Sequence, residues 1–251
     1  MREQAEQYHA KLTEVAAESS ESLMESYLEN DALTSEQIRQ GLRTRSINNE
    51  VILTLCGTAF KNKGVQPLLD AIVSYLPSPL DKEPVKDAGA EEGEVPSERK
   101  PLDSEPLSGM VFKITTDPFV GTLAFVRIYS GVLNSGDSFI NSSSLKKYRC
   151  GRIVQMHADQ REELKTLHAG DVGALIGLKG FKTGDTFCDA AHPFTLMNMN
   201  FADPVIHIAI EPKTKPDREK LSIALGKLSL EDPSFRVRTD EETGQTIIAG
   251  M

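Results

Sequence analysis

The chain has no tryptophan, only three cysteines in 251 residues, and no apolar run near the ~20 residues that cross a bilayer. The cysteines are odd in number, far apart and without a CxxC pair, so neither a disulfide framework nor a zinc site is expected. The five histidines have no metal-ligand spacing, and the sequence predicts no metal site. The acidic N-terminus lacks the apolar core of a secretory signal. We therefore expect a cytoplasmic protein that does not enter a membrane.

The motifs of nucleotide chemistry are also missing. The sequence contains no GxxxxGK(S/T) loop for phosphates, no DxxG switch and no NKxD for guanine. Phosphoryl transfer depends on such parts to position the reacting groups and to stabilise their charge. We therefore expect no catalytic residue in this chain and no bound cofactor.

The charge balance limits the class of partner. The chain carries 28 Lys and Arg against 37 Asp and Glu, a formal net charge of −9, so bulk charge does not favour a coat on nucleic acid. Only residues 107–200 are net basic, with ten Lys and Arg against eight acids. We therefore expect a local basic patch, if it binds nucleic acid, to lie within residues 107–200.

The first 106 residues divide into an α/β part and a linker. Apolar residues at three- and four-residue spacing predict helices over 1–48, one of them capped by Thr34. Val51–Cys56 reads as a buried parallel strand, and a helix containing Pro67 follows it. Residues 81–106 hold nine acids, four bases and four prolines, which predicts a solvated linker.

The rest of the chain reads as a β-rich domain followed by a mixed one. Short strands recur over 107–200, and three Gly-Asp pairs precede strands, as in a closed β-barrel. From residue 201 the pattern is β-α-β-β, the opening of a split βαβ sandwich, and it predicts an exposed apolar sheet face. The expected strands are Met110–Ile114, Leu123–Tyr129, Ser138–Ile140, Tyr148–Met156, Val172–Leu178, Thr186–Cys188, Val205–Ile210, Phe235–Arg238 and Gln245–Ile248.

Several stretches along nearly the whole chain have a family resemblance. They are Gly57–Gln66, Phe112–Ile114 with Asp117–Gly121, Arg127–Leu133, Gln155–Ala158, Glu211–Lys215 and Asp232–Met251. Together they resemble bacterial translation elongation factor G, the ribosomal translocase GTPase. The resemblance implies a central fragment with three parts. Residues 1–80 would be the C-terminal end of a P-loop-type G domain with its helical insertion, 107–200 the translation-factor β-barrel, and 201–251 the first half of a ferredoxin-like domain III.

The resemblance implies a function for the parent protein. The full-length factor would bind GTP and Mg²⁺ and promote GTP-dependent translocation of tRNA and mRNA. The fragment would be a non-catalytic module that binds the ribosome, both small-subunit RNA and a ribosomal protein near the barrel and domain III. Two alternatives stay open: a fragment of a ribosome-protection or release-factor-like GTPase, and a naturally short, nucleotide-free barrel that binds RNA or protein.

Three groups of candidate site residues follow. Thr58, Ala59 and Phe60 stand at the position of the family's fifth nucleotide motif, whose backbone would contact guanine in the full-length protein. Thr58 replaces the usual serine of this motif. The alternative is a strand-to-helix turn without a role in binding. Asp232, Ser234 and Arg236 resemble residues that line the interdomain fusidic-acid pocket of the family. The alternatives are that Asp232 and Ser234 form a turn that ends a helix, and that Arg236 pairs with Glu241 or Glu242. The candidates for binding of ribosomal RNA are Lys146, Lys147, Arg149, Arg152 and Arg161. The alternative is that these charges only keep an exposed strand edge soluble.

Overall fold

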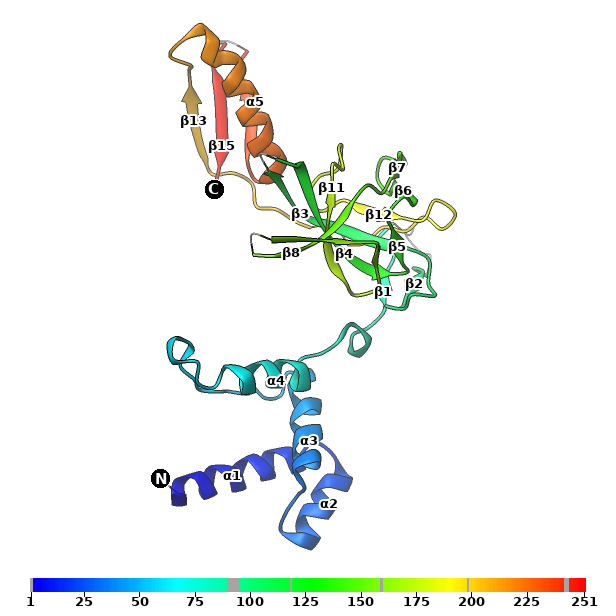
Figure 1. Cartoon of the computed structure of the whole chain (residues 1–251), viewed down its shortest axis with the longest axis vertical. Helices are drawn as coiled ribbons and strands as arrows, with labels where there is room; N and C mark the ends of the chain where they lie inside the picture. The colour runs from blue at the N-terminus through cyan, green and yellow to red at the C-terminus, as the bar shows by residue number, and fades with distance from the viewer. Residues whose placement is uncertain (1, 90–94, 118, 159, 198, 242–243) are drawn as a thin grey trace. The chain divides into compact units, whose positions relative to one another are not determined.

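The computed structural model describes residues 2–251 except 90–94, 118, 159, 198 and 242–243. It divides into two compact units, Met1–Lys82 and Glu83–Met251, and each is described by itself (Figure 1). Across the described residues, no helix is long and apolar enough to cross a membrane.

The first unit begins with three helices, α1 (Arg2–Ala17), α2 (Glu21–Asn30) and α3 (Ser35–Ile47). The predicted start of α3 is confirmed, since the Gln37 N–H donates to Thr34 Oγ1 at 3.3 Å and the Thr34 N–H donates to Gln37 Oε1 at 2.9 Å. α1 and α3 touch at Gly41, where a Cβ would lie 2.4 Å from the Ala16 carbonyl oxygen. A side chain at position 41 would therefore push the two helices apart.

The predicted strand at Val51–Cys56 is wrong. The segment is not assigned to any strand, and Ile52 is 94% exposed. A strand persists where a neighbour accepts and donates its backbone hydrogen bonds, and no described segment of this unit does so along these residues. The helix predicted after it is confirmed as α4 (Val65–Tyr75), which contains Pro67 in its first turn and is capped by Leu76.

The segment predicted as a solvated linker is ordered at both of its described ends. β1 (Val85–Lys86) pairs with β2 (Glu98–Arg99), and the side chain of Arg99 is buried. Its guanidinium donates to the carbonyls of Pro106, Leu107 and His192. Asp87 and Ala88 are also tied to the chain near Thr195, since the Ala88 N–H donates to the Thr195 carbonyl at 2.8 Å and the Thr195 N–H donates to Asp87 Oδ1 at 3.0 Å. The composition did not reveal this order because hydrogen bonds from polar groups, rather than a large set of aliphatic side chains, hold the segment.

The second unit contains an antiparallel sheet of eight strands in the order β7-β6-β12-β3-β4-β11-β8-β9. A separate pair, β5 (Leu133–Asn134) with β10 (Thr166–Leu167), joins the segment before β6 to the segment after β9 and so closes the barrel. The strands of the sheet are β3 (Ser108–Asp117), β4 (Gly121–Ser130), β6 (Ser138–Asn141), β7 (Lys147–Arg149), β8 (Ile153–His157), β9 (Gln160–Leu164), β11 (Val172–Ile176) and β12 (Thr186–Cys188).

Two features of the barrel differ from the sequence expectation. The single strand expected over Tyr148–Met156 is split into β7 and β8, because Cys150 turns inward and exchanges backbone hydrogen bonds with Gly136 and Asp137. The polar strand β9 and the two-residue strands β5 and β10 were not expected. They lack the apolar alternation that marks a half-buried strand.

The three Gly-Asp turns share one geometry. Each glycine has a positive φ, 94° at Gly136, 95° at Gly170 and 96° at Gly184, a conformation that costs glycine little. The aspartate that follows accepts the N–H three residues earlier, at 2.9, 2.8 and 2.9 Å respectively. The turn chemistry predicted from these pairs is confirmed.

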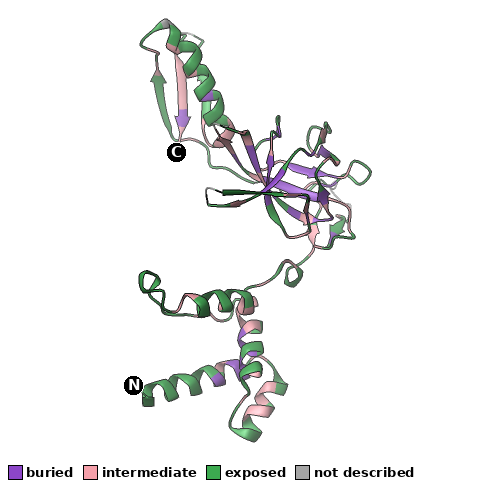
Figure 2. Ribbon diagram, viewed as in Figure 1, coloured by how far each residue is buried: buried purple, intermediate pink, exposed green. Residues whose placement is uncertain are grey.

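Aromatic rings fill the centre of the barrel. Phe139 is fully buried, with its ring centroid 5.1 Å from that of Phe187, 6.1 Å from Phe181 and 6.4 Å from Tyr148. Figure 2 shows the buried residues concentrated in these strands. Burial also raises the pKa of the Cys150 thiol, to about 11.

The β-α-β-β pattern at the C-terminal end is confirmed. β13 (Ile206–Ile210), β15 (Thr246–Gly250) and β14 (Arg236–Thr239) form an antiparallel sheet in that order, and α5 (Lys215–Glu231) connects β13 to β14. The expected exposed apolar residues are present on β13, where Ile206 and Ile208 are 55% and 54% exposed. The end of α5 meets the barrel, since Glu231 Oε1 accepts the Thr116 N–H at 2.6 Å.

Candidate functional site

The outer face of β7 carries unopposed positive charge. Tyr148 points into the barrel and meets Phe181 with 4.8 Å between ring centroids, so Lys147 and Arg149 point outward, and all three cations of this segment, Lys146 included, are exposed. Arg149 Nε donates to the Gly136 carbonyl at 3.1 Å, which orients the guanidinium. The sequence has no acidic residue between Asp137 and Asp159, so these cations have no acid nearby along the chain.

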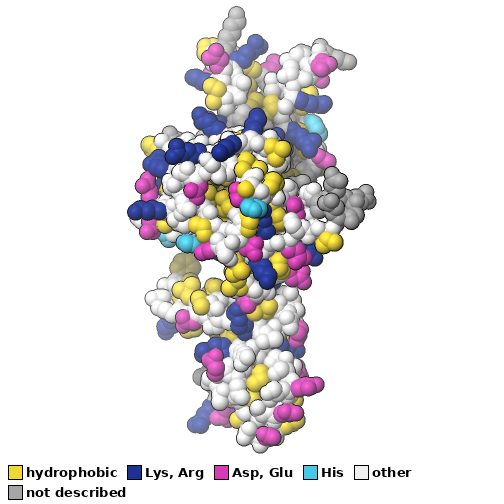
Figure 3. All heavy atoms as spheres, turned by 90° about the vertical axis from the view of Figure 1, so that its right-hand side faces the viewer, with side chains coloured by type: hydrophobic (Ala, Val, Ile, Leu, Met, Phe, Trp, Pro, Cys, Tyr) yellow, Lys and Arg dark blue, Asp and Glu magenta, His cyan; other side chains and the backbone are white. Residues whose placement is uncertain are grey.

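The other two basic candidates have acidic partners. Arg152 donates to Glu163 at 3.3 Å, and Arg161 on β9 pairs with Asp117. The pKa of Asp117 is lowered, first by hydrogen bonds from the N–H groups of Val120 and Phe119 and then by Arg161. The predicted group of five therefore separates into three cations at β7 and two ion-paired arginines at β8 and β9. Figure 3 shows one face of the molecule, on which basic and acidic side chains intermingle.

The loop before β7 was not singled out by sequence reasoning. Asn141, which is buried, accepts the N–H groups of Ser143 and Ser144 at 3.1 and 2.9 Å through Oδ1 and donates to Asp185 through Nδ2 at 2.9 Å. At the end of the loop, Leu145 has a φ of 54° and a side chain that is 68% exposed. The available signal was a polar amide directly after the apolar pair Phe139 and Ile140 of β6.

Residues 58–60 form a tight turn around Gly57 and Gly64. Thr58 exchanges backbone hydrogen bonds with Lys63 at 2.9 and 3.1 Å, and a 3-10 turn (Ala59–Lys61) lies between them. Phe60 is fully exposed, and no acceptor within the described chain receives the N–H of Ala59 or Phe60. The turn therefore offers two outward backbone donors, the kind of group that reads a carbonyl oxygen.

The group at Asp232 is a helix-ending turn. Asp232 Oδ1 accepts the Ser234 hydroxyl at 2.7 Å and the Ser234 N–H at 2.8 Å, and these two hydrogen bonds lower the pKa of Asp232. Arg236 donates at 2.6 Å to Asp203, a residue before β13, whereas the predicted partner was Glu241 or Glu242. Position 242 lies outside the described residues.

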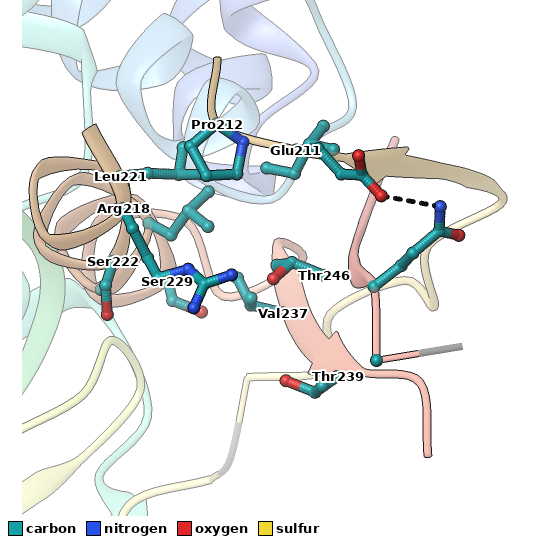
Figure 4. Close-up of a pocket in the computed structure, with 14 residues that line it drawn as sticks. Glu211, Pro212, Arg218, Leu221, Ser222, Ser229, Val237, Thr239 and Thr246 are labelled. Carbon is teal, nitrogen blue, oxygen red and sulfur yellow. Dashed lines mark hydrogen bonds between the residues drawn. The ribbon is translucent and has the colours of Figure 1, made fainter. Parts of the chain in front are cut away.

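A cavity of about 820 Å³ lies between α5 and its own sheet, and no pattern in the sequence indicated it. Figure 4 shows Arg218 reaching from α5 past Ser229 toward Val237 and Thr246 on the strands. On the far side, Gln245 Nε2 donates to Glu211 Oε1 at 3.0 Å. The lining mixes aliphatic side chains with hydroxyl groups. In the part of the chain that the structure describes, no cluster of His, Cys, Asp and Glu could hold a metal ion.

Comparison with known proteins decides the family. The model for elongation factor G domain 2 matches residues 106–190, and the model for elongation factor G domain III matches residues 201–251, which together is more than half of the chain. The chain belongs to the elongation factor G family. The domain 2 match covers strands β3 to β12, and the domain III match covers the β-α-β-β part, so the predicted fold class is confirmed.

A solved structure extends the likeness to the first unit. The crystal structure of ttk003000868 from Thermus thermophilus matches with a TM-score of 0.77 and 26% identity. The match covers 99% of this chain and 35% of that chain. The chain therefore spans about a third of the length of the protein it matches.

Proposed function

We propose that this chain is the ribosome-binding centre of a translational GTPase that moves tRNA and mRNA. In this proposal, GTP and Mg²⁺ are bound by parts of the longer protein outside these 251 residues, because the three motifs that hold them are missing from the sequence. The module supplies binding and orientation rather than catalysis, and it acts in the cytoplasm. Its membership in the elongation factor G family supports the proposal.

The β7 surface, defined as Lys146, Lys147 and Arg149, is the observation that carries this function. Three exposed cations without an ion-pair partner in the described structure are suited to phosphate oxygens, and the surrounding sequence has no acid to compete. Arg152 and Arg161 are secondary, because a phosphate would have to displace Glu163 or Asp117. We therefore propose small-subunit RNA as the partner of the β7 surface.

Two further roles belong to the parent protein. The free N–H groups of Ala59 and Phe60 in the turn that begins at Thr58 would face the guanine carbonyl once the missing nucleotide motifs are present. Asp232, Ser234 and Arg236 would line an interdomain drug pocket. In this structure the three residues are held by the hydrogen bonds within the Asp232 turn and by the Arg236–Asp203 pair.

Removal of the β7 charges tests the function. The triple variant Lys146→Ala, Lys147→Ala, Arg149→Ala is expected to weaken sedimentation with ribosomes and to reduce the slope of log affinity against log salt by about three, about one per phosphate contact. The matched control changes Lys11, Lys82 and Lys100 to alanine, which removes the same charge from exposed positions outside residues 107–251. Equal loss in both variants would mean that net charge, not the β7 surface, binds the ribosome.

A further inference from the structure

The β6–β7 loop, residues 142–146, is held in one conformation by a buried side chain. Asn141 is 2% exposed, and its Oδ1 receives three hydrogen bonds, from the Ser143 N–H, the Ser144 N–H and the Ser144 hydroxyl. The Asn141 carbonyl also accepts the Leu145 N–H at 2.8 Å. The loop is thus pre-organised, which lowers the entropy lost when it binds a partner.

Leu145 is an unfavourable residue for its position. A φ of 54° crowds the Cβ of an L-residue against its own backbone, and glycine or asparagine adopts this region far more readily. Packing does not compensate, because the side chain is 68% exposed. A strained backbone that carries an exposed leucine is typical of a contact surface rather than of a stabilising element.

The surroundings of Leu145 indicate the chemistry of its partner. Three serines precede it, and Lys146 and Lys147 follow it directly. Lysines suit phosphates, serine hydroxyls suit phosphates and ribose hydroxyls, and a leucine suits the apolar faces of the sugars. Duplex RNA presents all three in its minor groove, which is wide and shallow and is lined by 2′-hydroxyl groups.

We propose that the β6–β7 loop enters the minor groove of an RNA duplex, with Leu145 as an apolar wedge and Asn141 as the positioning residue. The inference rests on the proposed function and adds to it the form of RNA and the residue that contacts it. Lys146 and Lys147 bind the flanking phosphates. The loop selects a duplex because its rigid shape fits a groove and not a flexible single strand.

The variant Leu145→Asn separates contact from strain. Asparagine tolerates the positive φ, so the barrel of the variant should melt about 2–4 °C higher than that of the unsubstituted chain. The same variant should bind a 12-base-pair RNA hairpin about three- to tenfold more weakly by fluorescence anisotropy. The salt slope should not change, because no charge is lost. Lys146→Ala is the matched comparison, in which the slope falls by about one and the melting temperature stays the same.

Three outcomes would overturn the proposal. The first is that the unsubstituted chain binds the RNA hairpin, a DNA duplex and a single-stranded RNA of the same length with equal affinity. The second is unchanged RNA affinity of Leu145→Asn. The third is crosslinking of the loop to a ribosomal protein instead of RNA. If the unsubstituted chain sediments with ribosomes in any of these cases, only the proposed role of Leu145 is disproved. If it fails to sediment with ribosomes, the proposed function itself is overturned.

Discussion

Replacement of Arg99 by alanine is expected to lower the free energy of unfolding of the second unit by about 3–5 kcal/mol. Arg99 donates to the carbonyls of Leu107 and His192 at 2.9 and 2.6 Å and to that of Pro106 at 3.2 Å. Its guanidinium also lies 4.3 Å from the ring centroid of Phe194, a cation–π contact. Alanine leaves the His192 carbonyl without this donor, whereas the Pro106 carbonyl keeps the Ser130 hydroxyl and the Leu107 carbonyl keeps the Asp189 N–H. The segment around β2 also loses its link to the His192 region and its contact with Phe194.

Urea unfolding followed by far-UV circular dichroism measures this loss, since the chain has no tryptophan for fluorescence. Hydrogen exchange would then assign the loss to the segment around β2. Lys100→Ala is the matched control, because it removes the same charge from the adjacent exposed position and should change stability by less than about 0.5 kcal/mol. Equal stability of Arg99→Ala and Lys100→Ala would contradict the anchoring role.

Phe139→Ala is expected to cost a similar amount, about 3–5 kcal/mol, for a different reason. The ring of Phe139 is fully buried among the rings of Phe181, Phe187 and Tyr148, and its removal leaves a cavity that the closed barrel cannot fill by collapse. Phe139 lies on β6 and Tyr148 on β7, so the cavity would loosen these two strands together. RNA binding through the β7 surface should therefore weaken as well.

The measurement is again the free energy of unfolding in urea. Phe119→Ala is the control, because Phe119 is 89% exposed and its removal should cost less than about 0.5 kcal/mol. Phe139→Leu should lie between the two, since leucine fills part of the space. A Phe139→Ala protein as stable as Phe119→Ala would show that the aromatic cluster does not hold the barrel together.

The sequence predicted those elements whose signals are local. The capping box at Thr34, the three Gly-Asp turns and the β-α-β-β order all depend on residues within a few positions of one another. The strand at Val51–Cys56 failed because a strand also depends on a neighbour, and its apolar pattern says nothing about whether one is present. Arg99 was missed because its partner His192 lies 93 residues away in the sequence.

The candidate sites were predicted by residue type but not by pairing. Lys146, Lys147 and Arg149 are exposed as expected, whereas the partners of Arg161 and Arg236 come from segments 44 and 33 residues away. Leu145 had no signal at all in the sequence, because a backbone angle is not visible in composition or periodicity. The positive φ of Leu145 and the exposure of its side chain are seen only in the three-dimensional structure.

Sedimentation of the chain with separated ribosomal subunits tests most directly whether the barrel is a binding module for small-subunit RNA. The chain should pellet with the small subunit, remain in the supernatant with the large subunit, and be released steeply between about 50 and 200 mM salt. The triple β7 variant should pellet less with the small subunit than the unsubstituted chain and should depend less on salt. Binding of the chain to the large subunit alone, or binding that is indifferent to salt and to the β7 charges, would contradict the proposal.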